Sequence, residues 1–403
     1  MSLQRILLFI VSIIILIGVT WFGIKWFAPF EARLEPGVIE RDISKKHGGN
    51  TVTDTISQVS IPSFQVDTVA TGLDTPWSIV FTSPERMLVT ERPGRLRVIE
   101  QGRLLDKPLH VFSEVSEIGE EGLMSLALHP QYSENRFVYV SLAYQVADAM
   151  WVKVLRLKDE GNRLGDSFTI IDRIPADRYH AGSRIAFGPD GKLYVSTGDA
   201  TDKKLAQDLN SLAGKILRLH DDGTIPHDNP FGNAVWSYGH RNPQGLAWHP
   251  ETNNLYASEH GPSVFDGPAG GDEVNLIEKS KNYGWPLVSH EKHYDGTERP
   301  LIIFTPAEAP ASLLAYSGRQ HANWRGNLFF GALRGEGLVR LELDPHNPRK
   351  VLVAEKLEGI QVGRIREVME GPDGAVYFAT SNRDGRGKPA PEDDRIFRLS
   401  LKR

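Results

Sequence analysis

The chain from Phe64 onward alternates short apolar runs with turn residues, and this pattern repeats. Each copy has a turn of Pro, Gly, Asp or Asn, followed by a run rich in β-branched and aromatic residues, which is the pattern of a short strand. The copies start 46 to 75 residues apart, so each unit has room for about four strands. The six copies are SPERMLVTE, HPQYSENRFVYVSLAY, GPDGKLYVSTGD, HPETNNLYASEHG, WRGNLFFGAL and GPDGAVYFATSN.

Further strand candidates lie between these copies, in RLRVIEQG, KILRLHDDG, GLVRLELDP and RIFRLSLKR. Helical patterns are almost absent, and residues 202–212 are expected to form only a turn within a loop. Six four-stranded units predict an all-β fold, a six-bladed β-propeller over residues 63–403. The segment that begins at Phe64 is expected to pair with RIFRLSL and close the ring, which hides the sheet edges. A pair of β-sandwiches uses similar strands but does not explain the six-fold recurrence.

The N-terminus predicts a membrane anchor. Ile6–Ile24 is an uncharged run of 19 residues, about 29 Å long as a helix, which matches the hydrocarbon core of a bilayer. A cleaved signal peptide is the alternative, but the run is long for one and no small-x-small cleavage site follows it. We therefore expect an N-terminal transmembrane helix within residues 1–28 and a flexible linker over residues 29–62. Arg5 precedes the span, which favours a propeller on the periplasmic or extracellular side of the cell membrane.

Composition excludes several classes of site. The chain has no cysteine, so it has no disulfide, zinc–thiolate site or thiol nucleophile. The net charge of −5 is mild and argues against nucleic acid as a partner.

Polar residues gather where strands start or end, and most of them lie between Tyr238 and Trp285. Propellers bind ligands at the axial mouth, where loops from every blade converge. Arg241 offers a fixed fork of donors, and Pro243 biases Asn242 toward extended geometry.

Three more arginines are expected at the mouth: Arg334, Arg364 and Arg366. Residues 364 and 366 point to the same face of a strand. Four arginines at one mouth predict a pocket for a polyanionic ligand.

A second cluster carries only hard oxygen ligands. It comprises the side chains of Asp272, Glu273 and Tyr283 and the backbone carbonyls of Gly261 and Pro262. Hard oxygen ligands favour Ca²⁺ over zinc or copper. No EF-hand loop is present, so such a site would be assembled from separate turns.

Three other residues allow two interpretations each. Glu120, beside Glu121, belongs either to a solvated turn or to the mouth. His180 is either a structural histidine or a base. Asp199 is either a turn cap or a partner of the site. The residues alone leave these alternatives open.

The motifs EEGLMSLALHP, YHAGSRIAFGPDGKLYVSTGD, KILRLHDDGTIPHDNPF, YGHRNPQG, EHGP, GGDEVNLI and NYGWP occur in this order. Together they resemble the glucose/sorbosone dehydrogenase family over roughly residues 64–400. This family includes soluble aldose sugar dehydrogenases that use pyrroloquinoline quinone (PQQ). The resemblance implies a six-bladed propeller, PQQ and Ca²⁺ as cofactors, and oxidation of an aldose sugar at its anomeric carbon.

The resemblance also implies roles for individual residues. His180 matches the general base that takes the proton of the anomeric hydroxyl. Glu273 and Tyr283 match a structural Ca²⁺ site, and the carbonyls of Gly261 and Pro262 match ligands of the Ca²⁺ that binds PQQ. The residues implied to lie against the cofactor are Glu120, Asp199, Arg241, Asn242, Asp272, Tyr294, Arg334, Arg364 and Arg366.

The chain departs from the family pattern at three places. Glu120 stands where Gln is usual, and Arg334 stands where Lys is common. Residues 304–314 lack the Trp and the Ser-Gly pair often found beside the sugar. The sequence therefore predicts neither which sugar is oxidised nor the electron acceptor. The alternative functions are a non-catalytic ligand-binding propeller and a Ca²⁺-dependent lactone hydrolase.

Overall fold

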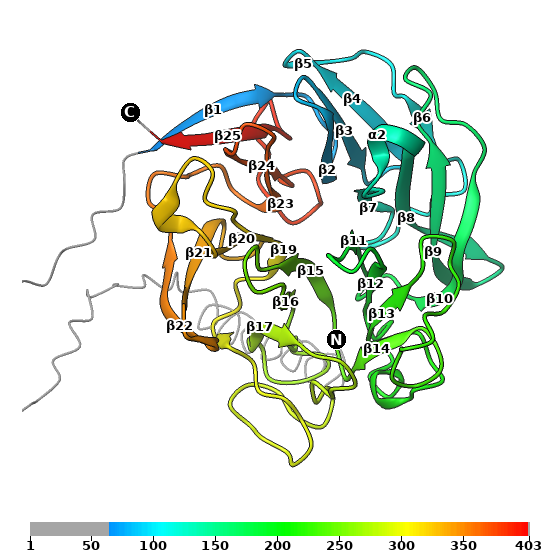
Figure 1. Ribbon diagram of the computed structural model, residues 1–403, viewed down its shortest axis with the longest axis vertical. Helices are drawn as coiled ribbons and strands as arrows, with labels where there is room; N and C mark the ends of the chain where they lie inside the picture. Colours follow the sequence, from blue (N-terminus) through cyan, green and yellow to red (C-terminus); the bar gives the residue numbers. More distant parts are fainter. Residues whose placement is uncertain (1–63, 402–403) are drawn as a thin grey trace, which may run out of the picture. The chain divides into compact units, whose positions relative to one another are not determined.

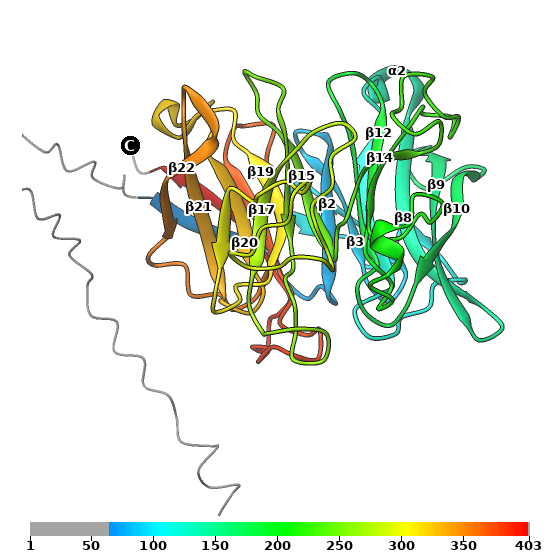
Figure 2. The same ribbon diagram turned by 90° about the horizontal axis from the view of Figure 1, so that it is seen from below.

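The computed structural model describes residues 64–401, which form six antiparallel sheets around a central axis (Figure 1). The innermost strands of neighbouring sheets contact one another in sequence order, and the last contacts the first, so the ring is closed. Seen from the side, the strands run along the axis and the connecting loops lie at the two ends of the ring (Figure 2). The predicted all-β six-bladed propeller is confirmed.

Each blade begins at the axis and continues outward. Blade 1 comprises β2 (Pro76–Ser83), β3 (Arg86–Glu91), β4 (Arg95–Glu100), β5 (Arg103–Leu104) and β6 (His110–Val111). Blade 2 comprises β7 (Leu123–Leu128), β8 (Phe137–Val146), β9 (Ala149–Lys158) and β10 (Phe168–Ala176). Blade 3 comprises β11 (Gly182–Phe187), β12 (Leu193–Thr197), β13 (Lys215–Leu219) and β14 (Val235–Tyr238).

The second half of the ring follows the same plan. Blade 4 comprises β15 (Pro243–Trp248), β16 (Leu255–Glu259), β17 (Asp272–Ile277) and β18 (Ile302–Phe304). Blade 5 comprises β19 (Pro310–Ala315), β20 (Leu328–Ala332), β21 (Gly337–Asp344) and β22 (Asn347–Lys356). Blade 6 comprises β23 (Ile365–Glu370), β24 (Val376–Thr380), β25 (Ile396–Leu401) and β1 (Phe64–Ala70).

The six sequence repeats correspond to the second strand of each blade. These strands read as continuous apolar runs because both of their faces are covered by neighbouring blades; β12 and β24, for example, are buried at every position. Helix is confined to short turns in this part of the chain: α2 (Tyr132–Asn135) and two 3₁₀ turns, Leu205–Gln207 and Ala322–Trp324. The first of these 3₁₀ turns is all the helix that residues 202–212 contain, as expected.

The ring closes in the predicted way. Strand β1 pairs antiparallel with β25, with Phe64 opposite Leu401, so the start of the described chain completes the blade that its end begins. This pairing joins the ends of the ring and leaves no open edge between blades 6 and 1.

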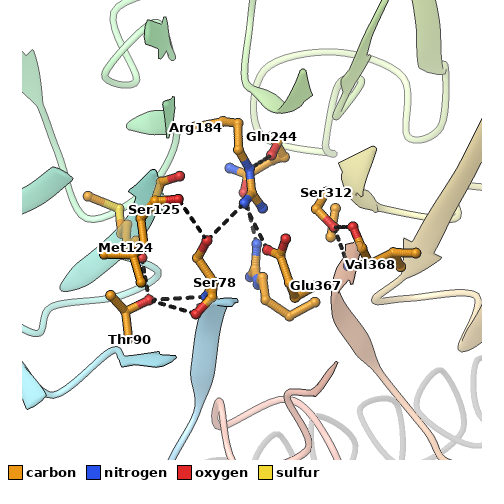
Figure 3. A network of polar contacts seen from close by, with 12 residues as sticks. Ser78, Thr90, Met124, Ser125, Arg184, Gln244, Ser312, Glu367 and Val368 are labelled. Atoms are coloured by element: carbon orange, nitrogen blue, oxygen red, sulfur yellow. Dashed lines mark hydrogen bonds and ion pairs between the residues drawn. The ribbon is translucent and has the colours of Figure 1, made fainter. Parts of the chain in front are cut away.

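Polar side chains near the axis connect the innermost strands (Figure 3). Arg184 on β11 donates to Glu367 on β23 at 2.8 Å, across the axis, and to the carbonyl of Gln244 on β15 at 3.0 Å. Ser125 on β7 accepts from Ile185 N, and Ser312 on β19 accepts from Val368 N. Arg184 therefore points into the axis of the ring rather than into the mouth, and its charge is neutralised there.

The predicted anchor in residues 1–28 and the linker in residues 29–62 lie outside the described residues. Within residues 64–401, no helix has the length and apolar character needed to cross a membrane.

Candidate active site

A cavity of about 410 Å³ lies at one end of the ring. Its lining residues lie before or at the start of the first strand of a blade, after the second strand, or at the start of the third. Antiparallel order brings these positions to the same end of the ring. Nine residues predicted from the sequence line it: Glu120, His180, Arg241, Gly261, Pro262, Asp272, Arg334, Arg364 and Arg366. The other lining residues are Arg92, Gly119, His260, Ser263, Ala307, Ala309, Leu333, Glu336, Asp384 and Arg386.

His180 and Asp199 form a buried pair. The distance from His180 Nδ1 to Asp199 Oδ1 is 2.9 Å, and the other carboxylate oxygen accepts from Trp285 Nε1 at 2.8 Å. Because a carboxylate only accepts hydrogen bonds, Nδ1 carries the proton and the lone pair resides on Nε2. Asp199 itself does not line the cavity; it lies behind His180 and fixes its tautomer and orientation.

The backbone at His180 is held in an uncommon conformation. Its φ angle is 63°, in the left-handed region. Its carbonyl accepts from Ala200 N and lies so close to Gly198 that a Cβ there would stand 1.8 Å from the oxygen. Only glycine allows this approach, so the STGD turn fixes the position of His180 through backbone as well as side-chain contacts.

Arg241 and Asn242 take different positions. Arg241 lines the cavity, donates through Nε to Asp266 at 2.7 Å and lies over the ring of Trp285. Asn242 is buried below the lining; its Oδ1 accepts from Gly182 N and from Gln244 Nε2. Its Nδ2 is buried and has no partner among residues 64–401.

The three later arginines differ in how far their charge is neutralised. Arg364 donates to Asp384 at 2.6 Å through Nη2. Arg366 is buried without a carboxylate partner in the described part of the chain and donates to Gln244 Oε1 at 2.8 Å; burial lowers its pKa to about 10. Arg334 is exposed at the rim. As predicted, Arg364 and Arg366 both point into the mouth.

Glu120 is neutralised by a residue that the sequence analysis did not single out. Arg386, from the long loop between β24 and β25, donates to Glu120 at 2.5 Å. Burial, the largest single influence, opposes ionisation of Glu120, but the positive groups around it, with Arg386 first among them, together lower the pKa of Glu120 below its usual range. A carboxylate therefore stands in the mouth with its charge paired.

Burial shifts the pKa of two further groups beside the cavity. Burial lowers the pKa of His260 to about 3, and its Nε2 has no hydrogen-bond partner within residues 64–401. Burial raises the pKa of Asp272, although Gly261 N and Ala309 N donate to its two oxygens at 2.8 and 2.6 Å. Asp272 therefore connects two walls of the cavity.

The four predicted metal ligands come together at a second, small cavity of about 20 Å³, where Gly261, Pro262, Glu273 and Tyr283 are among the lining residues. Glu259 lines the same space. Burial, together with the negative charge of Glu259, raises the pKa of Glu273 to about 8. The Tyr283 hydroxyl does not serve this cavity as a ligand: it donates to Leu276 O and accepts from Glu278 N.

Tyr294 is not brought to either cavity. It lies on the long connection between β17 and β18 with 58% of its surface exposed.

Sequence reasoning missed several residues at the mouth. His260 lies in the motif EHGP and Trp285 lies in the motif NYGWP. Membership of these motifs is the sequence signal that could have identified both residues. Phe265, Asp266 and Arg386 lie in irregular loops that carried no such signal. Phe265 stacks on the His180 ring, with 5.8 Å between ring centres and 21° between planes.

Comparison with known proteins identifies the family. Residues 73–389 match the family model described as Glucose / Sorbosone dehydrogenase. An uncharacterised protein of Synechocystis is 37% identical over 86% of this chain and 92% of its own length. An aldose sugar dehydrogenase of Escherichia coli is 33% identical over 79% of this chain and 91% of its own.

A solved structure gives the same result. The PQQ-bound form of aldose sugar dehydrogenase from Streptomyces coelicolor is 34% identical, covers 85% of this chain and 100% of its own, and superposes with a TM-score of 0.74. The family-model match, residues 73–389, includes every residue that lines the mouth. The chain therefore belongs to the glucose/sorbosone dehydrogenase family of sugar dehydrogenases.

Proposed function

We propose that this protein oxidises an aldose sugar at the anomeric carbon with PQQ as the redox cofactor. The observation that carries this proposal is the His180–Asp199 pair, which opens into a cavity where arginines from several blades converge. A base next to a polycationic pocket suits removal of a proton from a neutral substrate beside an anionic cofactor.

The residues present fit PQQ, which carries three carboxylates and an ortho-quinone. Arg334 and Arg366 have no carboxylate partner in the described part of the chain, so their charge is free for a ligand's carboxylates. Asn242, next to Arg241 in the chain, has a donor, Nδ2, without a hydrogen-bond partner within residues 64–401. Glu120, the departure from the family pattern, does not oppose an anion because Arg386 neutralises it.

The side chains have distinct roles in this proposal. When bound, PQQ supplies the two-electron chemistry that no side chain of the protein can supply. His180 takes the proton of the anomeric hydroxyl at Nε2, and Asp199 stabilises the imidazolium that forms. Arg241 offers its terminal nitrogens to an oxyanion in the cavity and is held in place by Asp266.

We also propose Ca²⁺ at the small cavity beside Glu273. Two carboxylates, those of Glu259 and Glu273, meet there, and Asn275 Oδ1 next to Glu273 is buried without a hydrogen-bond partner within residues 64–401. Within residues 64–401, no group of three or more His, Asp or Glu side chains is placed to hold a metal. Backbone carbonyls, such as that of Gly261, would therefore complete the ligand set.

Reconstitution tests the proposed function. The purified protein is stripped with a chelator, then mixed with PQQ and Ca²⁺, and PQQ binding is followed by its absorbance while dye reduction is measured with a panel of aldoses. We expect micromolar PQQ to bind and at least one aldose to reduce the dye. Absence of any PQQ-dependent spectral change contradicts the cofactor assignment. PQQ binding without turnover of any sugar favours a non-catalytic binding propeller, and hydrolysis of a lactone without PQQ favours the hydrolase.

A single substitution tests the base. His180→Ala is expected to lower kcat by at least about 100-fold, the usual contribution of a general base, with PQQ affinity changed little. His227→Ala, at an exposed histidine outside the cavity, is the matched control. Equal rates for His180→Ala and wild type remove His180 from the mechanism.

We retain the membrane anchor as a proposal that rests on the uncharged run Ile6–Ile24 alone. Two results support the anchor. The protein stays in the membrane pellet after carbonate extraction, and protease added to intact spheroplasts digests the propeller. Release into the soluble fraction contradicts it.

A further inference from the structure

The loop between β16 and β17, residues 260–271, folds into a compact turn at the mouth. Ser263 O accepts from Asp266 N at 3.0 Å and from Gly267 N at 2.9 Å, and Asp266 Oδ1 accepts from Ser263 N at 2.7 Å. Gly270 N donates to Pro262 O, which closes the base of the loop. These bonds give the tip of the loop a defined shape.

Two consecutive side chains of this turn contact two residues of the proposed site. Phe265 stacks on the ring of His180, which precedes β11 in blade 3. Asp266 pairs with Arg241 at 2.7 Å, and the Asp266 side chain is only 12% exposed. The buried ion pair anchors the turn, and the anchored turn places an aromatic ring over the base.

The stacking leaves the reactive edge of His180 open. Phe265 covers one face of the imidazole, and Asp199 occupies Nδ1. His180 still lines the 410 Å³ cavity. Phe265 contacts the face of the imidazole and Asp199 contacts Nδ1, so Nε2 is the ring nitrogen that can contact a ligand in the cavity. Phe265 does not cover Nε2.

Phe265 also keeps a large apolar surface free, since 63% of it is exposed. The cavity beside it is lined mostly by charged and polar side chains. A sugar in ring form has a face of C–H groups, and packing that face on an aromatic ring buries apolar surface of both. The exposed ring thus stands next to the atom that faces the anomeric hydroxyl.

We propose that Phe265 is a specificity-determining residue that receives the C–H face of a pyranose while the anomeric hydroxyl of the sugar faces His180 Nε2. This proposal rests on the proposed function and extends it by naming the substrate class, sugars in the ring form, and the residue that selects them. Asp266 acts as a positioning residue, because its ion pair with Arg241 holds the turn over His180.

The first test needs no cofactor. Saturation-transfer NMR is recorded on the full-length apo-protein with D-glucose and, separately, with the linear alditol sorbitol. We expect transfer to the ring C–H protons of glucose in the wild type and its loss in Phe265→Ala, with no difference between the two proteins for sorbitol. Val264→Ala is the matched control: Val264 is 88% exposed on the same turn. Equal transfer to glucose in Phe265→Ala and Val264→Ala overturns the proposal.

The second test uses the PQQ-loaded enzyme. Phe265→Ala is expected to raise KM for aldopyranoses about 10-fold, in line with the loss of one aromatic contact, while Phe265→Tyr keeps most of the wild-type KM. An unchanged KM in Phe265→Ala overturns the proposal. A higher kcat/KM in this variant also overturns it, because it would mean that the Phe265 side chain obstructs access of the sugar to the site.

The two tests separate this proposal from the proposed function. If glucose binds the apo-protein through Phe265 but no PQQ-dependent turnover occurs, the proposed function fails and the role of Phe265 stands. If sugar is oxidised and Phe265→Ala behaves like Val264→Ala in both experiments, the proposed function stands and the role of Phe265 fails.

Discussion

Glu120 and Glu121 show how the tertiary structure separates two neighbouring residues of the same type. Glu120 faces the mouth and pairs with Arg386, which lowers its pKa. Glu121 is 2% exposed and accepts from Ala181 N, and burial, together with the charge of Glu120, raises its pKa to about 8. A turn of two acids thus has one ionised and one protonated member at neutral pH.

This difference predicts a pH-dependent effect of Glu121→Gln on stability. A carboxyl whose pKa is raised on folding stabilises the fold fully below its unfolded pKa, and this contribution is lost as pH rises through the folded value. Wild type should therefore lose stability relative to Glu121→Gln between about pH 4.5 and about pH 8, by about 1.4 kcal/mol for each unit between the two pKa values. Urea unfolding at pH 5, 7 and 9 measures it.

The exposed Glu85→Gln is the control for this experiment and should follow wild type at every pH. A stability difference between Glu121→Gln and wild type that stays constant from pH 5 to pH 9 would show that Glu121 is ionised throughout.

At the scale of an element, a buried lysine side chain stabilises the loop between β12 and β13. It carries Asp199 at its start and has no long helix of its own. Lys215, fully buried at the first position of β13, donates through Nζ to the carbonyls of Leu205, Ala206 and Ala213 at 2.8, 3.1 and 2.6 Å. Burial lowers the pKa of Lys215 to about 7. The three hydrogen bonds of Lys215 thus order a loop that has few hydrogen bonds of regular secondary structure.

Replacing this residue should loosen the loop. Lys215→Met leaves three buried carbonyls without a donor, and each costs about 1–3 kcal/mol when unsatisfied. We expect a lower unfolding temperature and faster limited proteolysis between residues 200 and 213. Lys203→Met, at an exposed lysine in the same loop, should change neither measurement. Unchanged cleavage in Lys215→Met would mean that the loop is held by other contacts.

At the scale of the whole molecule, stability depends on closing the ring. Blade 6 takes three strands from the end of the described chain and one, β1, from its beginning. The pairing of β1 with β25 ties the beginning of the described chain to its end, and it reinforces the contact of β2 with β23 and β24 that joins blades 1 and 6.

A covalent link across this pair should stabilise the ring. Gln65 and Ser400 lie directly opposite one another, and the chain has no cysteine of its own to interfere. The double variant Gln65→Cys with Ser400→Cys, once oxidised, should gain about 2–4 kcal/mol and a higher Tm. The reducing agent dithiothreitol should reverse the gain, and the single variants should show none. Identical Tm values for the oxidised and reduced forms would mean that opening of blade 6 does not limit stability.

Much of the fold was predictable because its signals are local. A strand of this propeller is a short apolar run after a Gly, Pro, Asp or Asn turn, and such runs are visible in any stretch of a dozen residues. The closing pair β1–β25 followed from counting strands. Nine site residues were also found because they lie in motifs at strand ends, and strand ends of a propeller meet at one mouth.

The remaining features depend on contacts between loops from different blades. Arg386 pairs with Glu120, Phe265 stacks on His180, and Arg184 points into the axis of the ring. Tyr294 stays at the surface although the resemblance placed it at the cofactor. No local pattern encodes these outcomes, because irregular loops have no periodicity from which the direction of a side chain can be read.

By itself, then, the sequence determined the blades, their number, their closure and the family, since each rests on short-range strand and turn chemistry repeated along the chain. The tertiary structure alone decided which charges are neutralised, which tautomer His180 holds and which loop covers it. These properties depend on distances of a few ångströms between residues far apart in the chain, and only the closed ring sets those distances.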